Sequence, residues 1–128
     1  MFSLVVEVGF LDASEGFQLN VVTSLAIVDT LKDYLQEGVK IKWPNDIYFD
    51  NKKLSGMLIE NMIKNNSIFN SIIGVGLNVN QNSFLNPNAI SLLQICNQEI
   101  DRMDFLALLL GKFEARFLQL KKGMAARL

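Results

Sequence analysis

The stretch from residue 39 to residue 79 constrains the fold more than any other part of the chain. Apolar residues recur there at alternate positions, as they do on the buried face of a β-strand. Polar segments at residues 44–46, 50–52 and 64–66 interrupt this pattern, and their residue types are those of tight turns. Consecutive strands joined by short turns pair antiparallel, so the stretch predicts a meander of hairpins.

A strand and a helix are predicted before this meander. Residues 2–8 are rich in Val, Leu and Phe, as strands are. From residue 18 to residue 36, apolar side chains recur about every 3.6 positions, which predicts a helix with one buried face. Gly38 follows and suits the left-handed position after a helix. The predicted buried face consists of Val21, Leu25, Val28, Leu31 and Leu35.

Two helices are predicted after the meander. Residues 80–88 hold several asparagines and a proline, which indicates a loop, and residues 91–96 predict a short helix. Asp101 or Asp104 caps a longer helix that ends near Lys121. Its core-facing residues are expected to be Leu106, Leu109, Leu110, Phe113, Phe117 and Leu120. The sequence therefore predicts one α+β domain over residues 1–128, with an antiparallel or mixed sheet flanked by helices.

Composition excludes several classes of function. The 12 basic and 13 acidic residues form no basic stripe, so we expect no nucleic acid partner. The apolar run at residues 105–110 is far shorter than the ~20 residues of a membrane span, so we expect no membrane partner. Histidine is absent, which removes Ser–His and Cys–His nucleophile pairs and the commonest metal ligand. We therefore assign no metal-binding residue.

The single cysteine bears on the compartment. Cys96 has no partner for an intrachain disulfide, which favours a reducing environment. The N-terminus lacks the basic start and cleavage site of a secretory signal, so we expect a cytoplasmic protein. The apolar neighbours of Cys96 indicate a buried side chain and not a nucleophile.

Three short segments of the meander carry candidate chemistry. The first, residues 42–46, reads Lys-Trp-Pro-Asn-Asp. Proline has no N–H to donate, so within a strand it marks an edge or a bulge. That interruption would turn Asn45 and Asp46 away from the regular pleat. Pro-Asn-Asp is also ordinary turn chemistry, so this segment alone does not indicate a function.

The second segment, residues 52–60, reads Lys-Lys-Leu-Ser-Gly-Met-Leu-Ile-Glu. A glycine inside an apolar strand commonly marks a bulge or the close approach of a ligand. Lysines at a hairpin corner are also common as simple solvated charges. Unless Gly56 disrupts the register, alternation places on one face Lys53, Ser55 and Met57, and on the other Leu54, Gly56 and Leu58.

The third segment, residues 74–80, reads Gly-Val-Gly-Leu-Asn-Val-Asn. Gly74 and Gly76 remove the side chains from one strand face, which leaves a flat floor for a planar ring. Asn78 and Asn80 are expected on the same face, where their amides offer donors and acceptors. The competing explanation is another element packed closely over the glycines. No helix N-terminus follows, so the segment is not a dinucleotide-binding fingerprint.

In their order and spacing, these segments resemble the catalytic domain of the biotin–protein ligases. The resemblance lies in KWPND, then K-[LI]-[SA]-G-[MI]-L-[IV]-E, then G-[VAI]-G-[LI]-N-[VM]-N. It implies a class II synthetase-like fold, of which the chain holds the central and later part. It also implies an ATP-dependent ligase that forms biotinyl-5′-AMP, with Mg²⁺, and transfers biotin to a lysine of a biotin carboxyl carrier domain.

The resemblance assigns a biotin side to the site. Lys53 would contact the biotin carboxylate and the α-phosphate, and it is the first candidate catalytic residue. Gly56 and Leu58 would lie along biotin, and Gly74 and Gly76 would give room for its ring.

The resemblance also assigns a nucleotide side. Asn78 would reach the phosphates, together with Mg²⁺, and Asn45 and Asp46 match motif residues at the nucleotide and acceptor-lysine end. Asp46, the second candidate catalytic residue, either orients Lys53 or helps to deprotonate the incoming lysine. The sequence leaves both roles open.

The chain also departs from the family pattern. Family members carry a Gly-Arg-Gly-x-x-Gly loop and a Ser/Thr-containing strand before the first strand predicted here, and a small β-barrel after the catalytic domain. None of these occurs in this sequence, so we expect a catalytic domain truncated at both ends and impaired in adenylation. Two alternatives remain: a non-catalytic ligand-binding or self-associating paralogue, such as a homodimer paired through open strand edges, and a lipoate or octanoate transferase relative.

Overall fold

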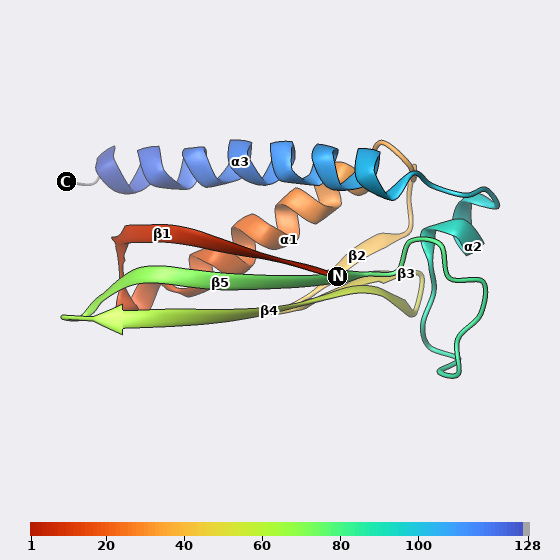
Figure 1. Ribbon diagram of the computed structural model, residues 1–128, viewed down its shortest axis with the longest axis horizontal. Coiled ribbons are helices and arrows are strands. Elements are labelled where there is room, and N and C mark those ends of the chain that lie inside the picture. The colour runs from red at the N-terminus through yellow and green to blue at the C-terminus, as the bar shows by residue number, and fades with distance from the viewer. Residues whose placement is uncertain (127–128) are drawn as a thin grey trace.

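A five-stranded antiparallel sheet forms the centre of the protein (Figure 1). The computed structural model describes residues 1–126. The strands lie in the order β1 (Phe2–Asp12), β5 (Ser67–Leu77), β4 (Lys52–Lys64), β3 (Asp46–Phe49) and β2 (Val39–Lys42). Each strand pairs antiparallel with its neighbour, so the predicted meander is confirmed from β2 to β5.

Helices cover one face of this sheet. The chain runs from β1 through the short 3-10 turn η1 (Ala13–Glu15) into α1 (Phe17–Leu31), and the sheet is followed by α2 (Leu92–Cys96) and α3 (Arg102–Ala126). Figure 1 shows α1 and α3 on the same side of the strands. The main core lies between these layers, and its fully buried members include Ile27, Leu31, Ile47, Leu54, Ile73 and Leu92. The predicted α+β class is therefore confirmed, with a sheet that is antiparallel throughout.

Asparagine and aspartate make the hairpin turns. Asp50 in the β3–β4 turn has φ 46°, and Asn65 and Asn66 in the β4–β5 turn have φ 52° and 67°. These two residue types tolerate the left-handed conformation that tight hairpins require. The predicted turns at residues 50–52 and 64–66 thus have their physical cause in single side chains.

The first strand is longer than predicted. The alternating pattern stops near Val8, but β1 continues to Asp12 across an irregularity in register between Glu7 and Leu11. Its pairing with β5 joins residues more than 50 positions apart, for example Asp12 and Ser67. A local pattern carries no information about such a partner, which is why the sequence predicts the strand but not its neighbour.

The buried face of α1 differs from the predicted one. Val21, Leu25 and Val28 are only partly buried, whereas Thr23 and Thr30 are buried completely or nearly so. Each threonine hydroxyl donates to the carbonyl oxygen four residues earlier, at 2.7 and 2.8 Å. A hydroxyl satisfied in this way can be buried at little cost, so counting apolar residues alone misplaces the face. The helix also ends at Leu31, with residues 32–34 in turns.

The last helix begins as predicted but ends later. Asp101 is its cap, because Oδ1 accepts the N–H groups of Met103 and Asp104 at 3.0 and 3.1 Å. The helix passes through Gly123 to Ala126, and glycine inside a helix costs only about 1 kcal/mol. On the core side, Phe105 is buried although it was not predicted, and Leu110 is 37% exposed although it was.

Candidate ligand-binding site

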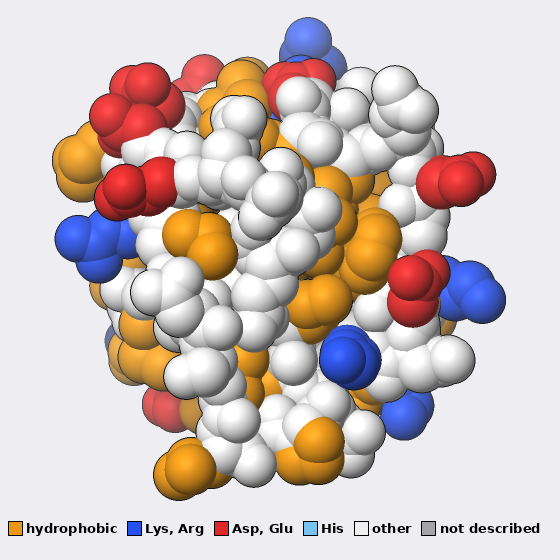
Figure 2. Space-filling view, turned by 90° about the vertical axis from the view of Figure 1, so that its right-hand side faces the viewer, with side chains coloured by type: hydrophobic (Ala, Val, Ile, Leu, Met, Phe, Trp, Pro, Cys, Tyr) orange, Lys and Arg blue, Asp and Glu red, His pale blue; other side chains and the backbone are white. Residues whose placement is uncertain are grey.

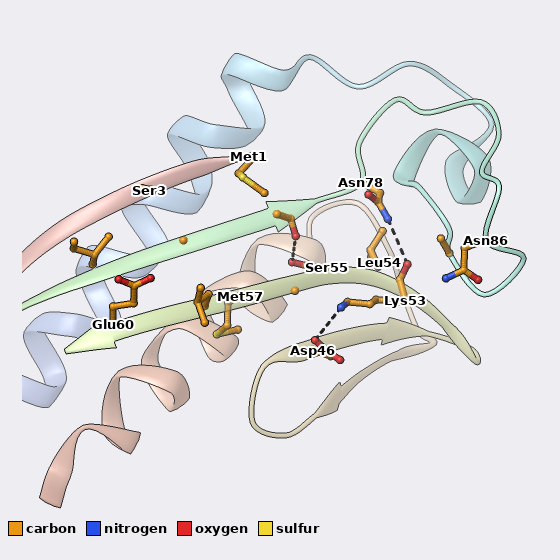
Figure 3. A pocket seen from close by; sticks show the side chains of 16 residues that line it. Met1, Ser3, Asp46, Lys53, Leu54, Ser55, Met57, Glu60, Asn78 and Asn86 are labelled. Carbon is orange, nitrogen blue, oxygen red and sulfur yellow. Dashed lines mark hydrogen bonds and ion pairs between the residues drawn. The ribbon is translucent and has the colours of Figure 1, made fainter.

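A pocket of about 580 Å³ lies on the face of the sheet opposite the helices (Figure 3). Its floor comes from β1, β3, β4 and β5, and the loop after β5 forms one wall. The volume is within the range of small-molecule sites, roughly 300–1,000 Å³. All three segments singled out in the sequence contribute to it, so the fold brings together residues from 46 to 78.

The floor of the pocket is bare backbone. Gly56 on β4 lies directly opposite Gly76 on β5, and Leu58 lies opposite Gly74. A Cβ atom added at Gly74 or Gly76 would meet nothing closer than 3.6 and 3.7 Å, which is ordinary contact. No element of the described chain therefore requires these two glycines by close packing. What they provide is an open, flat surface.

Gly56 has a different role, because it seats Lys53. A Cβ atom at Gly56 would lie 3.0 Å from Cε and 3.1 Å from Nζ of Lys53, which is closer than side chains normally approach. The Lys53 side chain thus lies across Gly56 and into the pocket. A side chain at position 56 would push the ammonium away from the floor.

The predicted placement of Lys53 on the face of Ser55 and Met57 is wrong. Tyr48 on β3 pairs with Lys53 and Ile47 with Ser55, which leaves Leu54 as an extra residue on β4. This β-bulge turns Leu54 and Ser55 both toward the core, where they are 0% and 2% exposed. The alternation is reset, so Lys53 shares a face with Gly56. Bulges commonly re-aim a side chain in this way beside functional sites.

Lys53 forms an ion pair inside the pocket. Its Nζ lies 3.2 Å from Oδ1 of Asp46, and the two side chains are 47% and 32% exposed (Figure 3). An ion pair this open to water contributes about 1 kcal/mol or less. The ammonium is therefore held in position but can exchange this partner for an incoming anion.

The loop after β5 is hydrogen-bonded to the backbone of Lys53. The N–H of Lys53 donates to the carbonyl of Asn88 at 2.7 Å, and the carbonyl of Lys53 accepts from Ile90 at 3.0 Å. Asn78 closes this arrangement, since its amide nitrogen donates to the carbonyls of Lys53 and Ile90 at 3.4 and 3.1 Å. Asn78 thus lines the pocket while its N–H₂ group holds the wall in place.

This wall is uncharged. Residues 65–98 contain no Asp, Glu, Lys or Arg. The end of the molecule at which the loop and α2 lie shows mostly uncharged surface, with charged side chains mainly at its rim (Figure 2). Among the described residues that line the pocket, Lys53 is the one cation, and Asp46 and Glu60 are the carboxylates.

Two predicted residues lie elsewhere. Asn45 points toward the helices, where its Oδ1 accepts from Nδ2 of Asn20 on α1 at 2.7 Å. Asn80, expected on the face of the glycines, lies after the end of β5 and instead exchanges two hydrogen bonds with the backbone of Ile100, at 2.7 and 2.9 Å. The placement of Asn80 was wrong because the strand stops at Leu77.

Sequence reasoning also missed part of the lining. Met1 and Ser3 reach the pocket because β1 pairs with β5, and Ser3 lies directly opposite Gly74. Asn86 and Ala89 reach it through the loop. Both the pairing of β1 with β5 and the course of the loop depend on contacts between residues far apart in the sequence. Local sequence patterns therefore could not have identified these four residues.

Cys96 lies away from this pocket. Its side chain is half-buried, with Sγ 3.9 Å from the carbonyl oxygen of Tyr34. Burial raises the pKa of its thiol, which makes the thiolate scarce at neutral pH.

Across residues 1–126, no group of three or more His, Cys, Asp or Glu side chains is placed to hold a metal ion. No helix in that range is long and apolar enough to cross a membrane.

Comparison with known proteins identifies the family. The model of the Biotin/lipoate A/B protein ligase family matches residues 1–78. The chain belongs to this family. The match includes β1 to β5, and therefore the glycine floor and the Lys53–Asp46 pair. The resemblance derived from the three segments is confirmed.

Individual members of the family agree with this assignment. The bifunctional ligase/repressor BirA of Bacillus subtilis is 36% identical over 105 residues, which are 78% of this chain and 32% of BirA. The biotin–[acetyl-CoA-carboxylase] ligase of Mycobacterium tuberculosis is 32% identical over 105 residues, 79% of this chain and 38% of that protein. The biotin protein ligase from Aquifex aeolicus in complex with biotin and ATP has 28% identity and a TM-score of 0.76, over 94% of this chain and 50% of that one.

These figures also define the extent of the match. The chain spans about a third of the length of both curated relatives and half of the Aquifex structure. Nearly all of its own residues are nevertheless included in the structural match. The expected fold, a partial catalytic domain of the biotin and lipoate ligases, is confirmed.

Proposed function

We propose that this chain carries the biotin and adenylate floor of an ATP-dependent biotin–protein ligase. The observation that supports this most directly is the bare strip of Gly56, Gly74 and Gly76 beside the Lys53–Asp46 pair. The bare backbone leaves room for the bicyclic ring of biotin, and the carboxylate of its side chain would reach the ammonium. The relatives that match are named for this activity, and one of the matching structures holds biotin and ATP.

The biotin end of the site is the glycine floor. Leu58 is 63% exposed on the same face and offers an apolar side chain beside Gly74. A bicyclic ring lying over Gly74 and Gly76 would cover Leu58 and bury apolar area that water now contacts, at about 25 cal/mol per Å². We assign biotin binding to Gly56, Leu58, Gly74 and Gly76, with Lys53 at the carboxylate.

The reaction centre is Lys53. In adenylation, a carboxylate oxygen of biotin attacks the α-phosphorus of ATP, the bond from that phosphorus to the β-bridging oxygen breaks, and pyrophosphate leaves with the electron pair. An ammonium between the carboxylate and the phosphate reduces their repulsion and stabilises charge that builds on the phosphoryl oxygens. Asp46, at 3.2 Å, orients that ammonium before the ligands arrive.

The nucleotide end is assigned to Asp46, Asn78 and Asn45. Mg²⁺ prefers oxygen ligands and is usually held by one or two carboxylates together with substrate phosphates. Asp46 fits this requirement, since its carboxylate lines the pocket and has only Lys53 as an ion-pair partner among the described residues. Asn45 would act through its backbone, or after its side chain releases Asn20.

The second half-reaction would use a protein partner. The acceptor in this proposal is the lysine of a biotin carboxyl carrier domain, and Asp46 is also suitably exposed to take a proton from that lysine. The unpaired thiol of Cys96 is compatible with a reducing compartment, and we propose the cytoplasm.

Direct binding tests this proposal. We expect the chain to bind biotin and ATP in isothermal titration calorimetry, and to catalyse biotin-dependent ATP–pyrophosphate exchange slowly, as predicted for a partial catalytic domain. Lys53→Ala should abolish the exchange and leave the thermal unfolding midpoint within a few degrees. Lys52→Ala removes an equal charge from the next position and should change neither property.

Three results would count against the assignment. Unchanged exchange in Lys53→Ala would remove Lys53 from the reaction. Absence of any biotin binding would remove the glycine floor from it. Tighter binding of lipoate than of biotin would indicate the other branch of the family, which the matched family description includes.

A self-associating binding module is the second candidate. Within the described residues, the outer edge of β1 is unpaired along 11 residues, of which only Glu7 and Asp12 are charged. The other edge strand, β2, has four residues, two of them lysines, and short charged edges resist pairing. The β1 edge is therefore the one suited to pair with a second copy. Light scattering should then show a dimer that Val6→Pro converts to monomer.

A further inference from the structure

A row of lysines continues the pocket face beyond the pocket itself. Directly opposite residues in antiparallel strands share a face, and Lys40 on β2 lies opposite Tyr48 on β3, which lies opposite Lys53 on β4. Lys42 lies opposite Asp46, one step along the same face. Three ammonium groups, two from β2 and one from β4, therefore stand on one surface, with the Asp46 carboxylate of β3 between them.

Tyr48 lies between the lysines of β2 and Lys53 of β4 and contacts one of them. The Nζ atom of Lys42 lies 4.9 Å from the centre of the Tyr48 ring, a cation–π contact. The contact keeps the Lys42 ammonium over the strand that separates it from Lys53. Within the described residues, neither Lys40 nor Lys42 forms a salt bridge, and both side chains are exposed. Their charge is thus available to a ligand.

The distances suit an extended anion. Lys53 and Lys40 are two strand spacings apart, roughly 10 Å at the backbone. Long lysine side chains on either side of Tyr48 can reduce that gap and reach one chain of phosphates. Glu60, the other carboxylate of the pocket, lies four residues along β4 from Gly56 and so at the far end of the floor.

We propose that Lys40 and Lys42 bind the β- and γ-phosphates of the nucleotide whose α-phosphate lies at Lys53. This inference rests on the proposed function. It assigns the leaving group of adenylation a place over β2 and β3. When the α–β phosphoanhydride bond breaks, the electron pair goes to the pyrophosphate oxygen, and two ammonium groups stabilise that charge. Tyr48 is a positioning residue, since it acts through Lys42.

Nucleotides of different phosphate length test this directly. We would titrate the chain with ATP, AMP and inorganic pyrophosphate by calorimetry. Lys42→Ala and Lys40→Ala should each weaken ATP and pyrophosphate about fivefold, the size of an exposed ion pair, and should leave AMP within twofold. Lys42→Arg should restore the affinity.

Two matched variants separate this inference from general electrostatics and from loss of fold. Lys52 pairs with Phe49 on the opposite face, so Lys52→Ala should change no affinity. Tyr48→Phe retains the ring and should behave as the wild type, whereas Tyr48→Leu should weaken ATP and not AMP. Circular dichroism of each variant should match the wild type.

Several outcomes would overturn the inference. These are an equal effect of Lys52→Ala, an equal loss of AMP and ATP affinity, or unchanged pyrophosphate binding in both lysine variants. Biotin titration of the same samples distinguishes failure of the phosphate assignment from failure of the proposed function. Biotin binding without a lysine effect would refute only the phosphate row, and absence of biotin binding would refute the proposed function.

Discussion

Adjacent residues of β5 lie in two very different surroundings. Ile73 and Val75 face the helices and are almost completely buried. Gly74 and Gly76, between and beside them, face the pocket and carry no side chain. One strand thus supplies stability on one face and an open floor on the other. The contrast shows that the glycines weaken only the face that does not hold the fold together.

The largest effect that separates the two faces is expected on stability. Ile73→Ala removes a fully buried side chain from the main core and should lower the free energy of unfolding by about 2–5 kcal/mol. Ile72→Ala, one residue earlier on the pocket face, should lower it by less than Ile73→Ala does, because the Ile72 side chain is only partly buried. Urea denaturation followed by circular dichroism measures both. Equal losses would contradict the division between the faces.

The next effect should be on ligand binding without loss of stability. Gly76→Val places a branched side chain on the floor, where the nearest atom to its Cβ is Cε of Met1 at 3.7 Å. We expect biotin affinity to fall at least about tenfold, or about 1.4 kcal/mol, because the ring loses its seat. The free energy of unfolding should change by less than about 1 kcal/mol.

Gly111→Ala is the matched control for that variant. Gly111 lies in α3 with nothing within 4 Å of its Cβ position, so alanine should stabilise the helix by about 0.5–1 kcal/mol and leave biotin binding unchanged. If Gly76→Val bound biotin normally, the floor would have to be assigned to another function.

The smallest effect concerns the helical layer. Arg116 on α3 holds the carboxylate of Asp29 on α1 through two bonds of 2.7 and 3.0 Å, and this hydrogen bonding lowers the pKa of Asp29 below its usual 3.8. A carboxyl group whose pKa is lower in the folded state than in the unfolded state stabilises the fold at pH values above its unfolded-state pKa. That stabilisation is lost as the pH falls through the folded-state pKa. Asp29→Asn should therefore cost about 1 kcal/mol or less at pH 7.

That cost should disappear at acid pH. Below the folded-state pKa of Asp29, the wild type and Asp29→Asn should have equal stability in urea titrations. A difference that stayed constant from pH 7 to pH 2 would show that packing, and not charge, links the two helices. A double-mutant cycle with Arg116→Ala isolates the pair.

Local patterns predicted the covered face better than the pocket. Period-two alternation and Asn or Asp turns placed β2 to β5, because those features depend on neighbouring residues. The three segments identified the family and the floor glycines for the same reason. The partner of β1, the reach of the loop to Ala89 and the position of Asn80 depend on contacts distant in sequence. No pattern within a single segment contains them.

The face of the sheet on which Lys53 lies depends on which residue of β4 forms the bulge. Regular alternation was expected unless Gly56 disrupted the register, whereas the extra residue is Leu54. Both residues could interrupt a strand. The bulge lies at Leu54 because it turns Leu54 and Ser55 inward together, and the Leu54 side chain then fills the core. The sequence contains the leucine, but the space it fills is known only from the fold.

The bulge at Leu54 makes the direction of the pocket cation depend on the hydrophobic core. Leu54 is anchored among buried side chains, and that anchorage rotates the preceding residue toward Gly56 and Asp46. A substitution that lets Leu54 return to the regular pleat would swing Lys53 to the helix side without touching any ligand contact. Transplanting this site to another sheet would therefore require moving the inserted leucine together with the lysine.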